Sequence, residues 1–163
     1  MASIGNCAYV LKCKLTVASR RKADDPLRLA HAVRHLGDAY YYAGRSAQAE
    51  SCYAEALSIY RGNEQRRPLD FANAIRSFAV LKDYVGAADA AKGLWQEAHD
   101  LYVTINVPAG VAESAARLAL QARRRGDLEQ SREWFNKATA AAEVSDDPET
   151  QQYIQQVRTQ IEG

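Results

Sequence analysis

The sequence has little of what marks exported, membrane-bound or metal-binding proteins. Its 3 cysteines are odd in number and form no CxxC pair, so we expect neither a disulfide framework nor a structural zinc site. No apolar run approaches the roughly 20 residues that span a bilayer. Two lysines interrupt the apolar stretch 8–15, which argues against a signal peptide. These absences predict a cytoplasmic protein with free thiols and no membrane partner.

The sequence also lacks an excess of one charge and the motifs of catalysis. Its net charge is +1, and the basic runs at 20–22, 66–67 and 123–125 fall at expected helix ends with acidic residues close behind. No glycine-rich phosphate loop, Ser/His/Asp order or pair of buried carboxylates is apparent in the sequence. We therefore expect no nucleic-acid partner, no cofactor and no enzymatic activity.

Proline is scarce, and its positions are almost evenly spaced. The 4 prolines are separated by 42, 40 and 40 residues, and they are Pro26, Pro68, Pro108 and Pro148. Four glycines fall between or before them: Gly5, Gly44, Gly86 and Gly126. Proline is tolerated in the first turn of a helix, and a glycine just past a helix end adopts the left-handed conformation that stops it. The spacing therefore predicts repeated helical hairpins, each opened by a proline and divided by a glycine.

The residues between these markers are apolar at helical spacing, and none alternate with the period of a strand. Small residues such as Gly37 and Ala56 allow helix axes to approach, while Tyr53, Trp95 and Phe135 fill the remaining space. The sequence therefore predicts an all-α fold.

These residues resemble the tetratricopeptide repeat, whose motif places Leu-Gly, an aromatic residue and a turn glycine on helix A, and Ala, an aromatic residue and Ala on helix B. The first repeat matches with Val33, Leu36, Gly37, Tyr40, Gly44, Ala49, Tyr53 and Ala56. Later repeats depart from the motif at Lys82, Ala122 and Ser131. The period of 40–42 exceeds the usual length of about 34, which resembles the long repeats of kinesin light chains and of bacterial proteins.

The resemblance implies a right-handed α-α superhelix of about eight antiparallel helices. We expect residues 1–163 to form a single domain, composed of a half repeat (5–25), repeat 1 (26–67), repeat 2 (68–107), repeat 3 (108–147) and a capping helix (148–163). Asp146 or Asp147 should cap the last helix.

The resemblance also implies a function: helix A residues line a concave groove that binds a peptide or a protein segment. The positions carried over to this sequence are His31, Arg34, Asp38, Tyr41, Tyr42, Asn73, Arg76, Asp83, Tyr84, Glu113, Arg123 and Arg124. They predict a non-catalytic scaffold or adaptor with a protein partner. The alternative is a sensory module that binds a signal peptide or a small molecule.

Two smaller features carry hypotheses of their own. His31, His35 and Asp38 share one helix face, as metal ligands would, so a metal-dependent enzyme is a remote alternative, although no further ligand cluster completes the set. Tyr9, Leu11 and Leu15 leave an apolar strip on the N-terminal half repeat. This strip predicts either a surface that docks a second copy of the chain, as in a homodimer, or another protein, or else a frayed or curled N-terminal segment.

Overall fold

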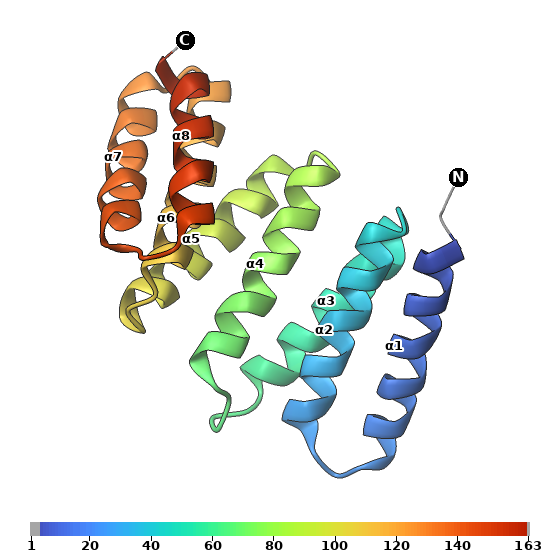
Figure 1. Cartoon of the computed structure of the whole chain (residues 1–163). Coiled ribbons are helices and arrows are strands. Elements are labelled where there is room, and N and C mark those ends of the chain that lie inside the picture. Colours follow the sequence, from blue (N-terminus) through green and yellow to red (C-terminus); the bar gives the residue numbers. More distant parts are fainter. Residues whose placement is uncertain (1–3, 163) are drawn as a thin grey trace. The chain divides into compact units, whose positions relative to one another are not determined.

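The computed structural model describes the backbone of residues 4–162 and the side chains of residues 7–161. This part of the chain contains eight α-helices and no strand, which confirms the predicted all-α class (Figure 1). The helices are α1 (Ile4–Lys22), α2 (Pro26–Tyr42), α3 (Ser46–Arg61), α4 (Pro68–Tyr84), α5 (Ala88–Thr104), α6 (Pro108–Arg124), α7 (Leu128–Val144) and α8 (Pro148–Glu162).

Seven of the eight prolines and glycines that were predicted to mark helix boundaries do so. Helices α2, α4, α6 and α8 each begin at a proline. Three of the glycines follow α2, α4 and α6 in the left-handed conformation, with φ of 71°, 77° and 80° at Gly44, Gly86 and Gly126. The expectation for Gly5 was wrong, because this residue lies inside α1 instead of before it. Asn106 takes the same conformation after α5, with φ of 54°, a role that asparagine fills less readily than glycine.

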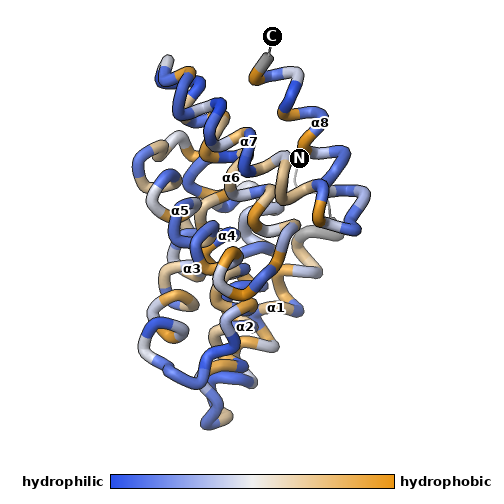
Figure 2. Tube along the Cα trace, turned by 90° about the vertical axis from the view of Figure 1, so that its left-hand side faces the viewer, coloured by the Kyte–Doolittle hydropathy of each residue, from blue (hydrophilic) through white to orange (hydrophobic). Residues whose placement is uncertain are grey.

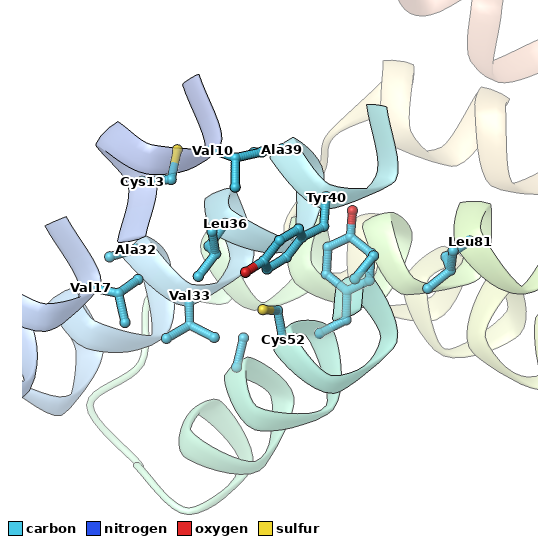
Figure 3. Close-up of a cluster of buried hydrophobic side chains, with 13 residues drawn as sticks. Val10, Cys13, Val17, Ala32, Val33, Leu36, Ala39, Tyr40, Cys52 and Leu81 are labelled. Atoms are coloured by element: carbon cyan, nitrogen blue, oxygen red, sulfur yellow. The ribbon is translucent and has the colours of Figure 1, made fainter. Parts of the chain in front are cut away.

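The chain divides into two compact units, and the first is Met1–Ala87. Within it α1 packs on α2, α2 on α3, and α3 on α4. Figure 3 shows the core of this unit, where Val10, Cys13 and Val17 of α1 lie beside side chains of α2 and α3. The interface between α2 and α3 is close because Gly37 faces the ring of Tyr53, which is 2% exposed.

The second unit is Ala88–Gly163, and in it α6 contacts α5, α7 and α8. Its core is rich in alanine, with larger side chains from α7 and α8 such as Phe135, Ile154 and Val157. The side chain of Asp147 accepts a hydrogen bond from the backbone N–H of Thr150 at 3.0 Å, so it caps the first turn of α8, as predicted.

Departures from the repeat motif have local explanations. Lys82 stands where an aromatic residue was expected, and its ammonium lies 2.6 Å from Glu50 of α3 and 5.1 Å from the centre of the Phe78 ring. Ser131 replaces an alanine, and its buried hydroxyl donates to the carbonyl of Ala119 at 2.9 Å. Each polar group therefore has a partner where the motif has an apolar side chain.

Apolar residues recur along each helix and are separated by polar ones (Figure 2). Consistent with this pattern, none of the helices in the described part of the chain is both long and apolar enough to cross a membrane.

Candidate interaction surface on α2 and α4

Nine of the twelve residues carried over from the repeat motif lie on α2 and α4, in the first unit. The other three, Glu113, Arg123 and Arg124, lie on α6 in the second unit. The first two are half-buried and the third is exposed. The α2–α4 face, as we name it, comprises the side chains of α2 and α4 that the motif assigns to a groove: His31, Arg34, Asp38, Tyr41, Tyr42, Asn73, Arg76, Asp83 and Tyr84.

Arg34 and Asp38 mainly contact other side chains of this protein. The guanidinium of Arg34 donates to the carboxylate of Asp38 at 3.1 Å, and their side chains are only 15% and 21% exposed. The hydroxyl of Tyr53, which belongs to α3, donates to the other oxygen of the same carboxylate at 2.8 Å. Burial and the charge of Asp38 raise the pKa of Tyr53, so its hydroxyl stays protonated and able to donate. Arg34 and Asp38 thus tie α2 to α3 and leave little surface for a partner.

The histidine pair does not have the geometry of a metal site. The rings of His31 and His35 meet edge to face with centroids 4.5 Å apart. Arg34 lies 2.7 Å from Nε2 of His35, and because a guanidinium has only donors, that nitrogen must act as the acceptor. Burial, and next the charge of Arg34, lower the pKa of His35, which leaves the ring neutral at pH 7. No group of three metal-ligating side chains occurs among the residues that the structure describes.

The exposed part of the α2–α4 face carries a cluster of three tyrosines. Tyr41 meets Tyr42 with ring centroids 5.3 Å apart and meets Tyr84 of α4 at 5.5 Å, both edge to face. Tyr42 and Tyr84 are 73% and 65% exposed. Edge-to-face contacts hold the rings in place while their outer surfaces stay open to solvent. This tyrosine cluster, Tyr41, Tyr42 and Tyr84, is a preformed aromatic surface at the C-terminal ends of both helices.

A pocket of about 760 Å³ lies at the opposite end of the same helices. It is lined by Tyr9, Lys12, Cys13, Thr16 and Arg20 of α1, Asp25, Leu27, Arg28, His31, Ala32 and His35 at or within α2, and Arg67 and Asp70 at or within α4. The N-terminal ends of α2 and α4 therefore meet at this pocket, while their C-terminal ends meet at the tyrosine cluster. The two helices run in the same direction, and the α2–α4 face extends between the two features.

Of the residues expected in the groove, only His31 lines this pocket. Most of the other lining residues were not predicted from the sequence to belong to a binding site. The contribution of α1 has a recognisable signal in the sequence: Tyr9, Lys12, Thr16 and Arg20 recur every three or four positions, which places them on one helix face. That signal identifies a polar stripe, but it does not indicate which neighbouring helix the stripe faces.

The apolar strip on α1 is exposed. Tyr9, Leu11 and Leu15 are 49%, 58% and 64% exposed, and Tyr9 lines the pocket. The helix itself is held to the first unit through Val10, Cys13 and Val17, which are buried in the core shared with α2. Self-association through the strip stays a prediction.

Comparison with solved structures identifies the fold. The crystal structure of BtubC (BKLC) from P. vanneervenii matches with a TM-score of 0.72 at 22% identity, over 88% of this chain and 59% of that chain. The N-terminal domain of stress-induced protein-1 (STI-1) from C. elegans matches with a TM-score of 0.63 at 15% identity, over 83% of this chain and 99% of that chain. No family model and no curated protein matches the sequence.

BtubC is a kinesin-light-chain-like tetratricopeptide-repeat protein, and the STI-1 domain is a tetratricopeptide-repeat domain. The chain therefore has the tetratricopeptide-repeat fold that its motif predicted. It spans less than two thirds of the length of the BtubC chain.

Proposed function

We propose that the protein is a non-catalytic scaffold that binds a segment of a partner protein along the α2–α4 face. The observation that carries this proposal is the exposed tyrosine cluster. Large aromatic side chains are enriched at protein interfaces because they offer much contact area, and their few rotatable bonds lose little entropy on binding. Tyr42 and Tyr84, at 73% and 65% exposure, come from two different helices yet belong to one continuous ring cluster.

The rest of the face supports the same function. Asn73, Arg76 and Asp83 of α4 are half-buried polar side chains, and His31 is exposed near the N-terminal end of α2. Interfaces between proteins that associate reversibly usually have aromatic residues at their centre and polar groups around them. Tetratricopeptide-repeat domains serve most often as protein-binding scaffolds, which favours a protein partner over a chemical reaction.

The proposal is tested by affinity capture from native lysate with two matched double variants. In the first, Tyr42→Ser and Tyr84→Ser remove the exposed rings from the α2–α4 face. In the second, Val103→Ser and Val144→Ser remove apolar side chains that are 55% and 72% exposed on α5 and α7. All four positions are exposed, so we expect both variants to keep the melting temperature of the wild type within a few degrees.

We expect the tyrosine variant to lose the proteins that the wild type enriches, while the valine variant retains them. Equal enrichment by both variants, with both folded, would contradict the proposal. Loss in the valine variant alone would move the binding surface to the second unit.

A further inference from the structure

The pocket between α1, α2 and α4 carries more positive than negative charge. Its cationic side chains are Lys12, Arg20, Arg28 and Arg67, and its carboxylates are Asp25 and Asp70. Each carboxylate already has a cation from the pocket: Asp25 lies 3.1 Å from Arg28, and Asp70 lies 3.7 Å from Arg67. Lys12 and Arg20 form no ion pair with any side chain in the described part of the chain. The pocket therefore has two uncompensated positive charges.

The pocket also has a less polar part of its lining. Cys13 and Ala32, which are buried, and Leu27, which is half-buried, belong to it. Lys12, Arg28 and Arg67 are exposed around it, and Arg20 is half-buried. Cations that border a concave, partly apolar surface act on a ligand more strongly than cations on an open surface, because the low-polarity wall reduces solvent screening.

We propose that this pocket binds an acidic segment of the partner protein, an inference that rests on the function proposed above and names the chemistry of the ligand. Lys12 and Arg20 of α1 would pair with carboxylates of the segment, and Arg28 of α2 and Arg67 at the start of α4 would add donors. The charge complementarity is local, since the chain as a whole has a net charge of only +1.

The position of the pocket also defines how such a segment runs. Arg28 and Tyr41 are thirteen residues apart on α2, a distance of about 20 Å along a helix. About six residues of extended chain span this length. An acidic stretch in the pocket therefore places the residues about six positions away at the tyrosine cluster, so a single segment contacts both features.

A peptide suits the pocket better than a nucleic acid. A nucleic acid carries a phosphate at every nucleotide and needs a long track of cations, whereas this pocket offers two uncompensated charges. Its one aromatic side chain outside the histidines, Tyr9, gives no series of rings on which bases stack.

The test uses fluorescence anisotropy with the full chain and a fluorescein-labelled peptide of six glutamates. A peptide of six glutamines serves as the uncharged control. We expect the glutamate peptide to bind, and to bind more weakly as the salt concentration rises from about 50 to about 200 mM. The glutamine peptide should show no saturable binding.

Two double variants of α1 locate the site. Lys12→Gln with Arg20→Gln removes the uncompensated charges, and we expect about fivefold or weaker binding of the glutamate peptide. Lys14→Gln with Lys22→Gln makes the same change in net charge on the same helix at exposed positions that do not line the pocket, so the affinity should stay within about twofold. Equal weakening in both variants would show nonspecific attraction to α1 and would overturn the proposal.

Two further measurements test whether the pocket binds a different ligand. Tighter binding of a single-stranded RNA dodecamer than of the glutamate peptide, lost in the Lys12/Arg20 variant, would overturn the proposal in favour of nucleic acid. Sedimentation that shows a dimer of the wild type and a monomer of this variant would overturn it by assigning the pocket to a second copy of the chain.

Failure of this inference is distinguishable from failure of the proposed function. The variant with Tyr42→Ser and Tyr84→Ser should bind the glutamate peptide as the wild type does, because the probe is held by the pocket alone. If the glutamate peptide does not bind while the tyrosine variant still loses its partner in lysate, only the acidic ligand is wrong. If the tyrosine variant keeps its partner, the function itself is wrong.

Discussion

A methyl group at position 37 should destabilise the protein, although alanine is ordinarily a better helix residue than glycine. A Cβ on Gly37 would lie 2.7 Å and 2.8 Å from two ring carbons of Tyr53, and 3.2 Å from Cβ of Cys52. The ring has nowhere to move, because it is 2% exposed and its hydroxyl is held by Asp38 at 2.8 Å. Helices α2 and α3 must therefore separate to admit the methyl group.

The magnitude follows from two opposing effects. Overpacking a tight core costs about 1–3 kcal/mol, and the two contacts below 3.0 Å place this site in the upper part of that range. The exchange of glycine for alanine inside a helix returns about 0.8–1.0 kcal/mol. We therefore expect Gly37→Ala to lower the free energy of unfolding by about 1–2 kcal/mol, which corresponds to a fall in melting temperature of about 2–8 °C for a chain of this size.

Thermal unfolding followed by circular dichroism tests whether the loss of stability comes from the contact with the Tyr53 ring. One variant serves as a control, and a second background removes the ring. Gly93 lies inside α5, where a methyl group would meet no side chain or neighbouring helix within 4 Å, so Gly93→Ala should raise the melting temperature. In a Tyr53→Leu background, which is itself destabilised, Gly37→Ala should cost less than in the wild type because the ring is gone. A rise in melting temperature for Gly37→Ala alone would refute the close approach of α2 and α3 at this point.

Three further predictions concern Arg34, His99 and Cys52. Arg34→Ala should lower the free energy of unfolding by about 1–3 kcal/mol, because it removes a cation from the part-buried Asp38. The melting temperature should therefore fall even when no partner is present. Burial lowers the pKa of His99; the unfolded chain therefore takes up a proton below pH of about 6.5 that the folded chain does not. Stability should thus fall as the pH is lowered from about 8 to about 5.5, and fall less in His99→Gln, as thermal unfolding at both pH values would show. Burial raises the pKa of Cys52 to about 11, so at a pH of about 8 a thiol reagent such as dithionitrobenzoate should label the exposed Cys7 quickly and Cys52 only on unfolding.

The helices could be predicted from the sequence because their boundaries depend on local chemistry. Pro68 and Gly86 act mainly through their own backbone angles, and each lies at a helix boundary where the sequence predicted one. Gly5 shows the limit of this reasoning: glycine permits the left-handed conformation but does not require it, and here the residue is part of α1.

The site was predictable only where a side chain's role does not depend on a distant element. Tyr42 was identified from its place in the motif, and it is exposed. Arg34 occupies an equivalent place, yet its use is decided by the position of Asp38 relative to Tyr53 of α3, which lies 15 residues further along the chain. The pocket could not be predicted from the sequence for the same reason. Lys12 becomes part of a pocket only because α1 packs against α2.

The most direct test of the proposed binding face is a photo-crosslinking experiment. The photoreactive residue benzoylphenylalanine is placed at Tyr42 on the α2–α4 face or, in a second protein, at the similarly exposed Val144 of α7. After irradiation in native lysate, we expect a discrete crosslinked partner from position 42 and none from position 144. Adducts from position 144 that equal or exceed those from position 42 would contradict a partner bound on the α2–α4 face.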